Sequence, residues 1–133
     1  MIIMRLILAA SAALALAGCE TAPIKEVRQG ISSLFQTNAG EPDLASGIRQ
    51  YEDGNYAEAS RLLSASLEKG LSRPDQVRAH KHLAFIHCVA GRESRCREEF
   101  RNTLKLDPSF ELAANEAGHP IWGPVFRSVK SRR

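Results

Sequence analysis

The sequence predicts an all-α fold, a short array of helical hairpins closed by a C-terminal helix. From Leu44 onward, apolar residues recur three and four positions apart, which is the spacing of a buried helix face. This pattern occurs twice, and the central glycines of the two copies, Gly54 and Gly91, lie 37 residues apart. A glycine at this place is typical of the left-handed turn that ends a helix. We therefore expect residues 44–133 to form one domain of paired helices.

The composition is that of a single folded domain. The chain has 133 residues, of which 44% are hydrophobic and 25% are charged. Its 18 basic and 15 acidic residues are interspersed, which gives a formal net charge of +3. The one local basic excess is the tail RSVKSRR, residues 127–133, and no aromatic residues alternate with it. We therefore expect no nucleic-acid partner.

The first residues have the pattern of a secretory signal. MIIMR carries a positive charge, and LILAASAALALA, residues 6–17, is shorter than the roughly 20 apolar residues of a membrane span. The tetrapeptide LAGC, residues 16–19, resembles the bacterial lipobox. That resemblance implies that residues 1–18 are a signal peptide and that Cys19 becomes the lipidated first residue of the mature chain, with palmitate among its acyl groups. The alternative is an ordinary signal peptide in which Cys19 is incidental.

A lipid on Cys19 would hold the chain at a membrane, because two or more acyl chains anchor a protein stably. The next residue is Glu20 and not the aspartate that retains lipoproteins at the inner membrane of enteric bacteria. We therefore expect an outer-membrane lipoprotein that faces the periplasm. Residues 19–43 contain two prolines and two glycines and are expected to form a flexible lipidated tether. As a coil, this segment would span about 27 Å. The alternative is that part of it forms an amphipathic helix, because its apolar residues lie at helical spacing.

Small residues recur at equivalent positions of the two copies. When Gly54 is aligned with Gly91, Gly47 falls opposite Ala84 and Ala59 opposite Cys96. Small side chains in the middle of a helix let a second helix approach closely. These positions therefore predict where the two helices of each hairpin meet.

The two copies resemble the tetratricopeptide repeat, a helical hairpin of about 34 residues that closes with a proline. The second copy, residues 77–110, has Pro108 at the closing position, whereas the first copy, residues 40–73, has Leu71 there. An insertion around residues 74–76 would explain the longer period of 37. The alternative is an unrelated four-helix bundle.

A fifth helix is expected over residues 121–131. Trp122, Val125, Phe126 and Val129 lie at helical spacing, and a proline is acceptable in a first helical turn. Because stacked hairpins leave an apolar end exposed, this helix is predicted to cap the array. Trp122 is then a core residue of the cap and not a ligand-stacking residue.

The motifs of common enzyme classes do not occur in the sequence, so we expect no catalytic residues and no enzyme activity. The segment with His80, His82, His87, Cys88 and Cys96 is the best candidate for a metal site, and the alternative is that the histidines lie on the surface or in a groove. On one helix His80 and His87 share a side while His82 points elsewhere, which does not favour a common metal. We expect no metal, no cofactor beyond the lipid and no small-molecule substrate, and a metal or ligand carrier is the weaker alternative.

Cys88 and Cys96 are predicted to form a disulfide across the turn of the second hairpin. Helix axes about 9 Å apart bring facing α-carbons to roughly 4–5 Å, which a disulfide accommodates. An oxidising compartment favours the bond. The alternative is that Cys96 only fills a small-residue position, with Cys88 as its unbonded neighbour.

The first helices of such an array line a concave face that binds peptides or partner proteins. The residues expected to contribute to this face are Ile48, Tyr51, Glu52, Arg78, Lys81 and Phe85.

Residues 79–130, together with the lipobox, are similar to a family of repeat-containing lipoproteins of bacterial type VI secretion systems, TssQ. The resemblance rests on HLAFIHC, the paired cysteines, DPSF and GHPIWGPVF. It implies an accessory component of the secretion machinery, with envelope or secretion-system proteins as partners and no catalytic residues. A pilotin-like lipoprotein that escorts outer-membrane subunits is the alternative.

Overall fold

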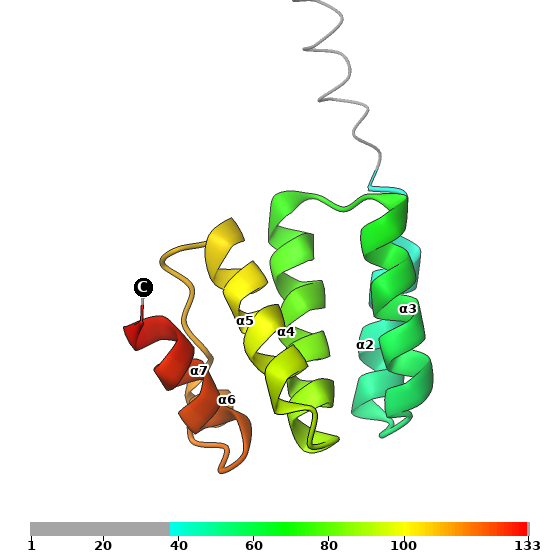
Figure 1. Cartoon of the computed structure of the whole chain (residues 1–133). Coiled ribbons are helices and arrows are strands. Elements are labelled where there is room, and N and C mark those ends of the chain that lie inside the picture. The colour runs from blue at the N-terminus through cyan, green and yellow to red at the C-terminus, as the bar shows by residue number, and fades with distance from the viewer. Residues whose placement is uncertain (1–37, 133) are drawn as a thin grey trace, which may run out of the picture.

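The computed structural model describes residues 38–132, and within them the chain is all-helical, as predicted (Figure 1). The bounds of the helices, in chain order, are α2 Glu41–Glu52, α3 Tyr56–Lys69, α4 Arg73–Val89, α5 Glu93–Leu106, α6 Ala114–Ala117 and α7 Trp122–Ser131. Helices α2 and α3 form one hairpin and α4 and α5 a second, and the two hairpins lie side by side. Helix α7 packs on α5 at the end of the array, as expected of a cap.

The connections α2–α3, α4–α5 and α6–α7 all lie at one end of the molecule, the lower end in Figure 1. The chain enters α2 at the opposite end, where the N–H of Gly40 donates to the carbonyl of Gly70 at 2.9 Å. Helix α3, with 14 residues, joins the two ends and is about 21 Å long. The array therefore has an entry end and a turn end, separated by one helix length.

The two turns have the same hydrogen bonds. Gly54 and Gly91 have φ values of 80° and 73°, in the left-handed region that glycine adopts without steric cost. The N–H of each glycine donates to the carbonyl three residues earlier, and the N–H of the following residue donates to the carbonyl five residues earlier. This is the pattern of a Schellman motif. The two copies of the predicted repeat therefore have the same backbone hydrogen bonds at their turns.

The interior consists of two apolar clusters. The first-hairpin core joins α2 and α3 to α4 and contains Leu44, Ala59, Leu63, Leu71, Ala79, Leu83 and Ile86. The cap core joins α4 and α5 to α7 and includes Phe85, Cys88, Cys96, Phe100, Leu104, Leu112, Trp122, Phe126 and Val129. Tyr51 packs against both clusters. The burial of Trp122 in the cap core, 8% exposed, confirms that it anchors the cap.

The small residues lie where the helices approach most closely. A Cβ atom added to Gly47 would lie 2.9 Å from Cγ of Leu63 and 3.2 Å from the backbone nitrogen of Leu63. The equivalent Ala84, and both Ala59 and Cys96, are 0% exposed. Each hairpin is therefore packed through its mid-helix small residues, as predicted.

The domain begins before residue 44, the predicted boundary, because helix α2 begins at Glu41 with Pro42 in its first turn. The Asn38 side chain accepts a hydrogen bond from the N–H of Ser72 at 2.9 Å and donates to Asp75 at 3.0 Å. Proline is well suited to a first helical turn, where N–H groups lack intrahelical partners. The predicted tether therefore extends too far, and residues 38–43 belong to the domain.

The predicted insertion around residues 74–76 is part of a helix. Helix α4 begins at Arg73, with Ser72 as its N-cap, and has 17 residues against 12 in α2. The additional residues therefore lengthen α4 at its start and do not widen the loop before it. Helix α7 begins within one residue of its predicted start, whereas the single turn of α6 was not predicted.

Substitution of Gly47 tests the close helix contact. Gly47→Val should lower the free energy of unfolding by about 1–3 kcal/mol, because its branched side chain overlaps Leu63 in a packed core. Urea denaturation followed by circular dichroism measures this change. The control is Gly118→Val, which meets no atom within 4 Å at an ordinary φ of −81° and should change stability by less than about 0.5 kcal/mol. Equal losses in the two variants would contradict the packing role of Gly47.

Candidate partner-binding surface

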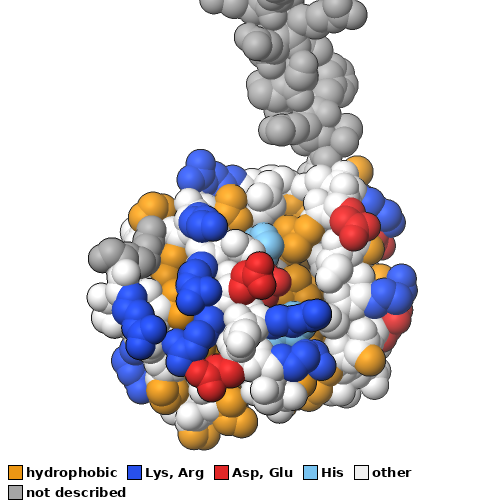
Figure 2. All heavy atoms as spheres, viewed as in Figure 1, with side chains coloured by type: hydrophobic (Ala, Val, Ile, Leu, Met, Phe, Trp, Pro, Cys, Tyr) orange, Lys and Arg blue, Asp and Glu red, His pale blue; other side chains and the backbone are white. Residues whose placement is uncertain are grey.

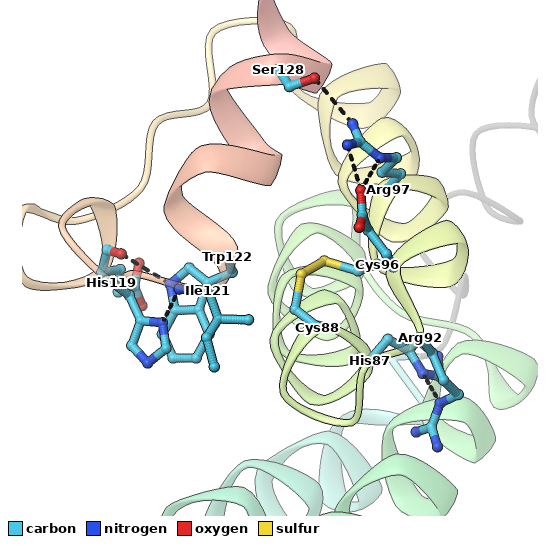
Figure 3. Close-up of a disulfide and its surroundings, with 11 residues drawn as sticks. His87, Cys88, Arg92, Cys96, Arg97, His119, Ile121, Trp122 and Ser128 are labelled. Atoms are coloured by element: carbon cyan, nitrogen blue, oxygen red, sulfur yellow. Dashed lines mark hydrogen bonds and ion pairs between the residues drawn. A yellow bond between two sulfur atoms is a disulfide. The ribbon is translucent and has the colours of Figure 1, made fainter.

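Cys88 and Cys96 form a disulfide across the turn of the second hairpin, with their α-carbons 5.1 Å apart (Figure 3). The bond joins the last turn of α4 to the first turns of α5. Cys96 is 0% exposed and Cys88 is 6% exposed, and both belong to the cap core. The disulfide is therefore an internal brace that holds the turn end of this hairpin.

A second link fixes the cap to α5 close to this brace. Arg97, on α5, donates to the hydroxyl of Ser128 on α7 at 3.0 Å and pairs with Glu93 on its own helix (Figure 3). Because Arg97 is one residue from Cys96, the disulfide and the cap contact stabilise the same part of α5.

The three histidines of α4 each have a different protein partner. Nδ1 of His80 lies 2.6 Å from the carboxylate of Glu99 on α5. Nδ1 of His82 lies 2.7 Å from the carbonyl of Arg78. Nδ1 of His87, a buried residue that is 7% exposed, accepts from Nε of Arg92 at 3.0 Å. Residues 38–132 contain no group of three or more potential metal ligands.

Burial determines the protonation of two of these histidines. Desolvation lowers the pKa of His82 below its ordinary value of 6.5, and the charges of Lys81 and Arg78 lower it further, against the Arg78 carbonyl and Glu116, which raise it. Desolvation also lowers the pKa of His87, as does the adjacent charge of Arg92. Both rings therefore favour the neutral form in the fold.

Phe85, predicted to line the concave face, is a core residue. It is 1% exposed, and its ring stacks on that of Trp122 with centroids 4.3 Å apart. The prediction for Phe85 is therefore wrong, because helix α7 packs over the part of α4 that a bare second repeat would leave open. Lys81 is also used internally, since its ammonium group bonds Glu116 of α6 at 2.7 Å and lies 5.6 Å from the Phe85 ring centroid.

The remaining residues predicted for the concave face are divided between core and solvent. Ile48 and Tyr51 are half-buried against the two cores, and Tyr51 makes an edge contact with the ring of His82 at 5.2 Å. Glu52 and Arg78 are exposed, and Arg78 pairs with Asp75 on its own helix. The structure therefore does not bring the six residues together on one open face.

An open groove of about 680 Å³ lies at the turn end, between the start of α3 and the α4–α5 turn. Its apolar lining includes Tyr56, Ala57 and Val89, and its polar lining includes His87, Arg92 and Arg95. No acidic residue is among the lining residues. In the view of Figure 2, basic, histidine and hydrophobic side chains adjoin one another in the part of the surface over the α4–α5 turn.

This groove could not be predicted from the sequence, because its walls come from two hairpins that meet only in the folded chain. The one feature that indicates the groove is a set of large apolar residues that lie beside the turns and stay exposed in the fold. Tyr56, Val89 and Ile121, exposed by 41%, 38% and 46%, are the exposed large hydrophobic residues of the described part of the chain. All three lie in or next to a connection at the turn end.

Comparisons of this chain with family models, with curated proteins and with solved structures found no match. None of the helices in residues 38–132 has the length and apolar character needed to cross a membrane. Cys19, the predicted lipidation site, the signal peptide and most of the tether lie outside the described residues.

The disulfide should be detectable by thiol counting and by its effect on stability. Neither Cys88 nor Cys96 should react with a thiol reagent in the denatured protein until a reductant is added. Replacing both with Ala should lower the free energy of unfolding by roughly 2–3 kcal/mol, since closing a loop of this length restricts the unfolded chain by that amount. Equal labelling with and without reductant would show that the bond does not form.

The lowered pKa values of His82 and His87 predict a loss of stability in mild acid. Below about pH 7 the unfolded chain takes up protons on these rings before the folded chain does, so folding becomes less favourable as the pH falls. We expect the thermal unfolding midpoint to decrease between about pH 7 and about pH 5.5, and to decrease less in the double variant His82→Gln, His87→Gln. Parallel profiles for the two proteins would exclude these histidines as the cause.

Proposed function

We propose that this protein is a non-enzymatic lipoprotein of the outer membrane that faces the periplasm and acts as a protein–protein interaction module. Its role is that of an accessory component of a type VI secretion system. The proposal unites two features of the chain, a lipobox-like LAGC at residues 16–19 and a braced helical array from residue 38 to residue 132.

The arrangement of the two ends of the array is the observation that carries the proposal. The chain from the predicted lipid site enters beside Gly40 and Gly70, at the entry end. The groove begins at Tyr56, at the other end of α3, about 21 Å away. A lipid anchor at Cys19 would leave the turn end free to meet a partner in the periplasm.

The rigidity of the turn end supports a binding role. The disulfide, the Arg97–Ser128 contact and the stacking of Phe85 on Trp122 all hold the second hairpin to itself or to the cap. A surface that is already ordered loses less conformational entropy when a partner binds. The three histidines of α4 each bond a different protein group, which supports a structural role for them.

Affinity capture from membranes tests the proposal. The tagged full-length protein should incorporate a palmitate analogue, fractionate with the outer membrane and, after cross-linking, co-purify with components of a type VI apparatus identified by mass spectrometry. The matched control is Cys19→Ala, which should lose the label, the fractionation and the cross-links. Capture of secretin or pilus subunits would instead support a pilotin-like role, and capture of no envelope protein would contradict both.

A further inference from the structure

The groove at the turn end combines two features that protein-binding sites use. Tyr56 and Val89 are exposed apolar side chains on opposite sides of it, one at the start of α3 and the other at the end of α4. Its volume of about 680 Å³ can receive at least one large side chain together with adjacent backbone. The groove therefore offers apolar contact area that the fold itself does not use.

The charge beside this apolar area has one sign. Arg92 and Arg95 line the groove, and neither forms an ion pair with another described residue. Nε of Arg92 donates to Nδ1 of His87, which orients its guanidinium and leaves the terminal nitrogens available. By contrast, the described arginines that do pair with a carboxylate are Arg61, Arg78 and Arg97.

Nearby carboxylates do not neutralise these two arginines. Glu93 pairs with Arg97, and Glu99 pairs with His80. Glu98 is exposed and is not among the lining residues of the groove. An arginine without a carboxylate partner, at the edge of an apolar surface, is a favourable site for a carboxylate from another molecule, because its planar donors bind both oxygens at once.

We propose that this groove binds an acidic segment of a partner protein, with one large apolar side chain held between Tyr56 and Val89 and adjacent carboxylates bound by Arg92 and Arg95. The proposal deepens the proposed function, on which it rests, by naming the surface and the chemistry of the partner. Charge complementarity favours a peptide that carries Asp or Glu, and the exposed apolar pair favours an aromatic or long aliphatic anchor.

Selection from a library of random peptides tests this proposal. The probe is a phage-displayed library, selected against the purified full-length protein in non-ionic detergent, and the enriched peptides are then synthesised with a fluorescent label. We expect them to carry Asp or Glu within a few residues of a large apolar residue. We also expect them to bind Arg95→Glu about tenfold or more weakly, since the substitution removes charge-assisted hydrogen bonds and places a carboxylate against the acidic peptide.

Two further variants separate the groove from its surroundings. Val89→Asp should also weaken binding, because it places a carboxylate in the apolar part of the groove. The matched control is Arg101→Glu, an exposed arginine on the same helix that does not line the groove, which should leave binding unchanged. Circular dichroism of each variant establishes that the fold is retained.

Three outcomes would overturn the proposal: no enriched peptide, enriched peptides without carboxylates, or equal weakening by Arg95→Glu and Arg101→Glu. Binding of the wild-type protein, but not of Arg95→Glu, to phosphatidylglycerol vesicles would also overturn it in favour of an anionic lipid surface. Capture of secretion components by both wild type and Arg95→Glu would contradict the groove and leave the proposed function standing. Acidic-peptide binding without any captured envelope protein would support the groove and contradict the proposed function.

Discussion

Close contact between the two helices of each hairpin is the constraint on which the rest of the structure depends. At Gly47 the backbone of α2 lies so near Leu63 that even a methyl group would collide with it. In the second hairpin Ala84 occupies the place of Gly47, and Cys96 that of Ala59, with no exposed surface. Helices this close must be joined by a short turn, and the left-handed conformation of Gly54 and Gly91 supplies it.

The packing of only two hairpins also requires a cap. Two hairpins alone would leave the outer face of the second one open, with Phe85 and Phe100 toward solvent. In the structure Trp122 stacks on Phe85 at 4.3 Å, and Phe126 meets Phe100 at 5.2 Å. The carbonyl of Glu116 also accepts the indole N–H of Trp122, and its carboxylate binds Lys81. Phe85 and Lys81, which were predicted to face a partner, therefore contact the C-terminal segment that closes the array.

The features that could be predicted from the sequence are those set by local spacing. Periodicity predicted the four main helices, the glycines predicted both turns, and a separation of eight residues across one turn placed Cys88 near Cys96. The early starts of α2 and α4 were missed because Pro42 was assigned to the tether and Pro74 to an insertion between the repeats, although both prolines lie in first helical turns.

The site was harder to predict than the fold because its contacts join residues far apart in the chain. Lys81 meets Glu116 across 35 residues, and nothing in the spacing of α4 indicates that this lysine is engaged. Phe85 has the position of a concave-face residue in a repeat, and only the placement of α7 makes it part of the core. The groove depends on the meeting of α3 with the α4–α5 turn, which is likewise a tertiary contact.

The two turns have the same backbone geometry but different side chains at one equivalent position. Asn55 and Arg92 are equivalent residues, and each donates its N–H to the carbonyl of the residue five positions earlier, Gln50 or His87. The side chains of the same pairs also bond, Asn55 to Gln50 at 2.9 Å and Arg92 to His87 at 3.0 Å. In the first repeat this pair is neutral, whereas in the second it places a guanidinium beside an apolar groove. The backbone of the repeat therefore fixes where the side chain points, and the change from amide to guanidinium gives that position its affinity for a carboxylate.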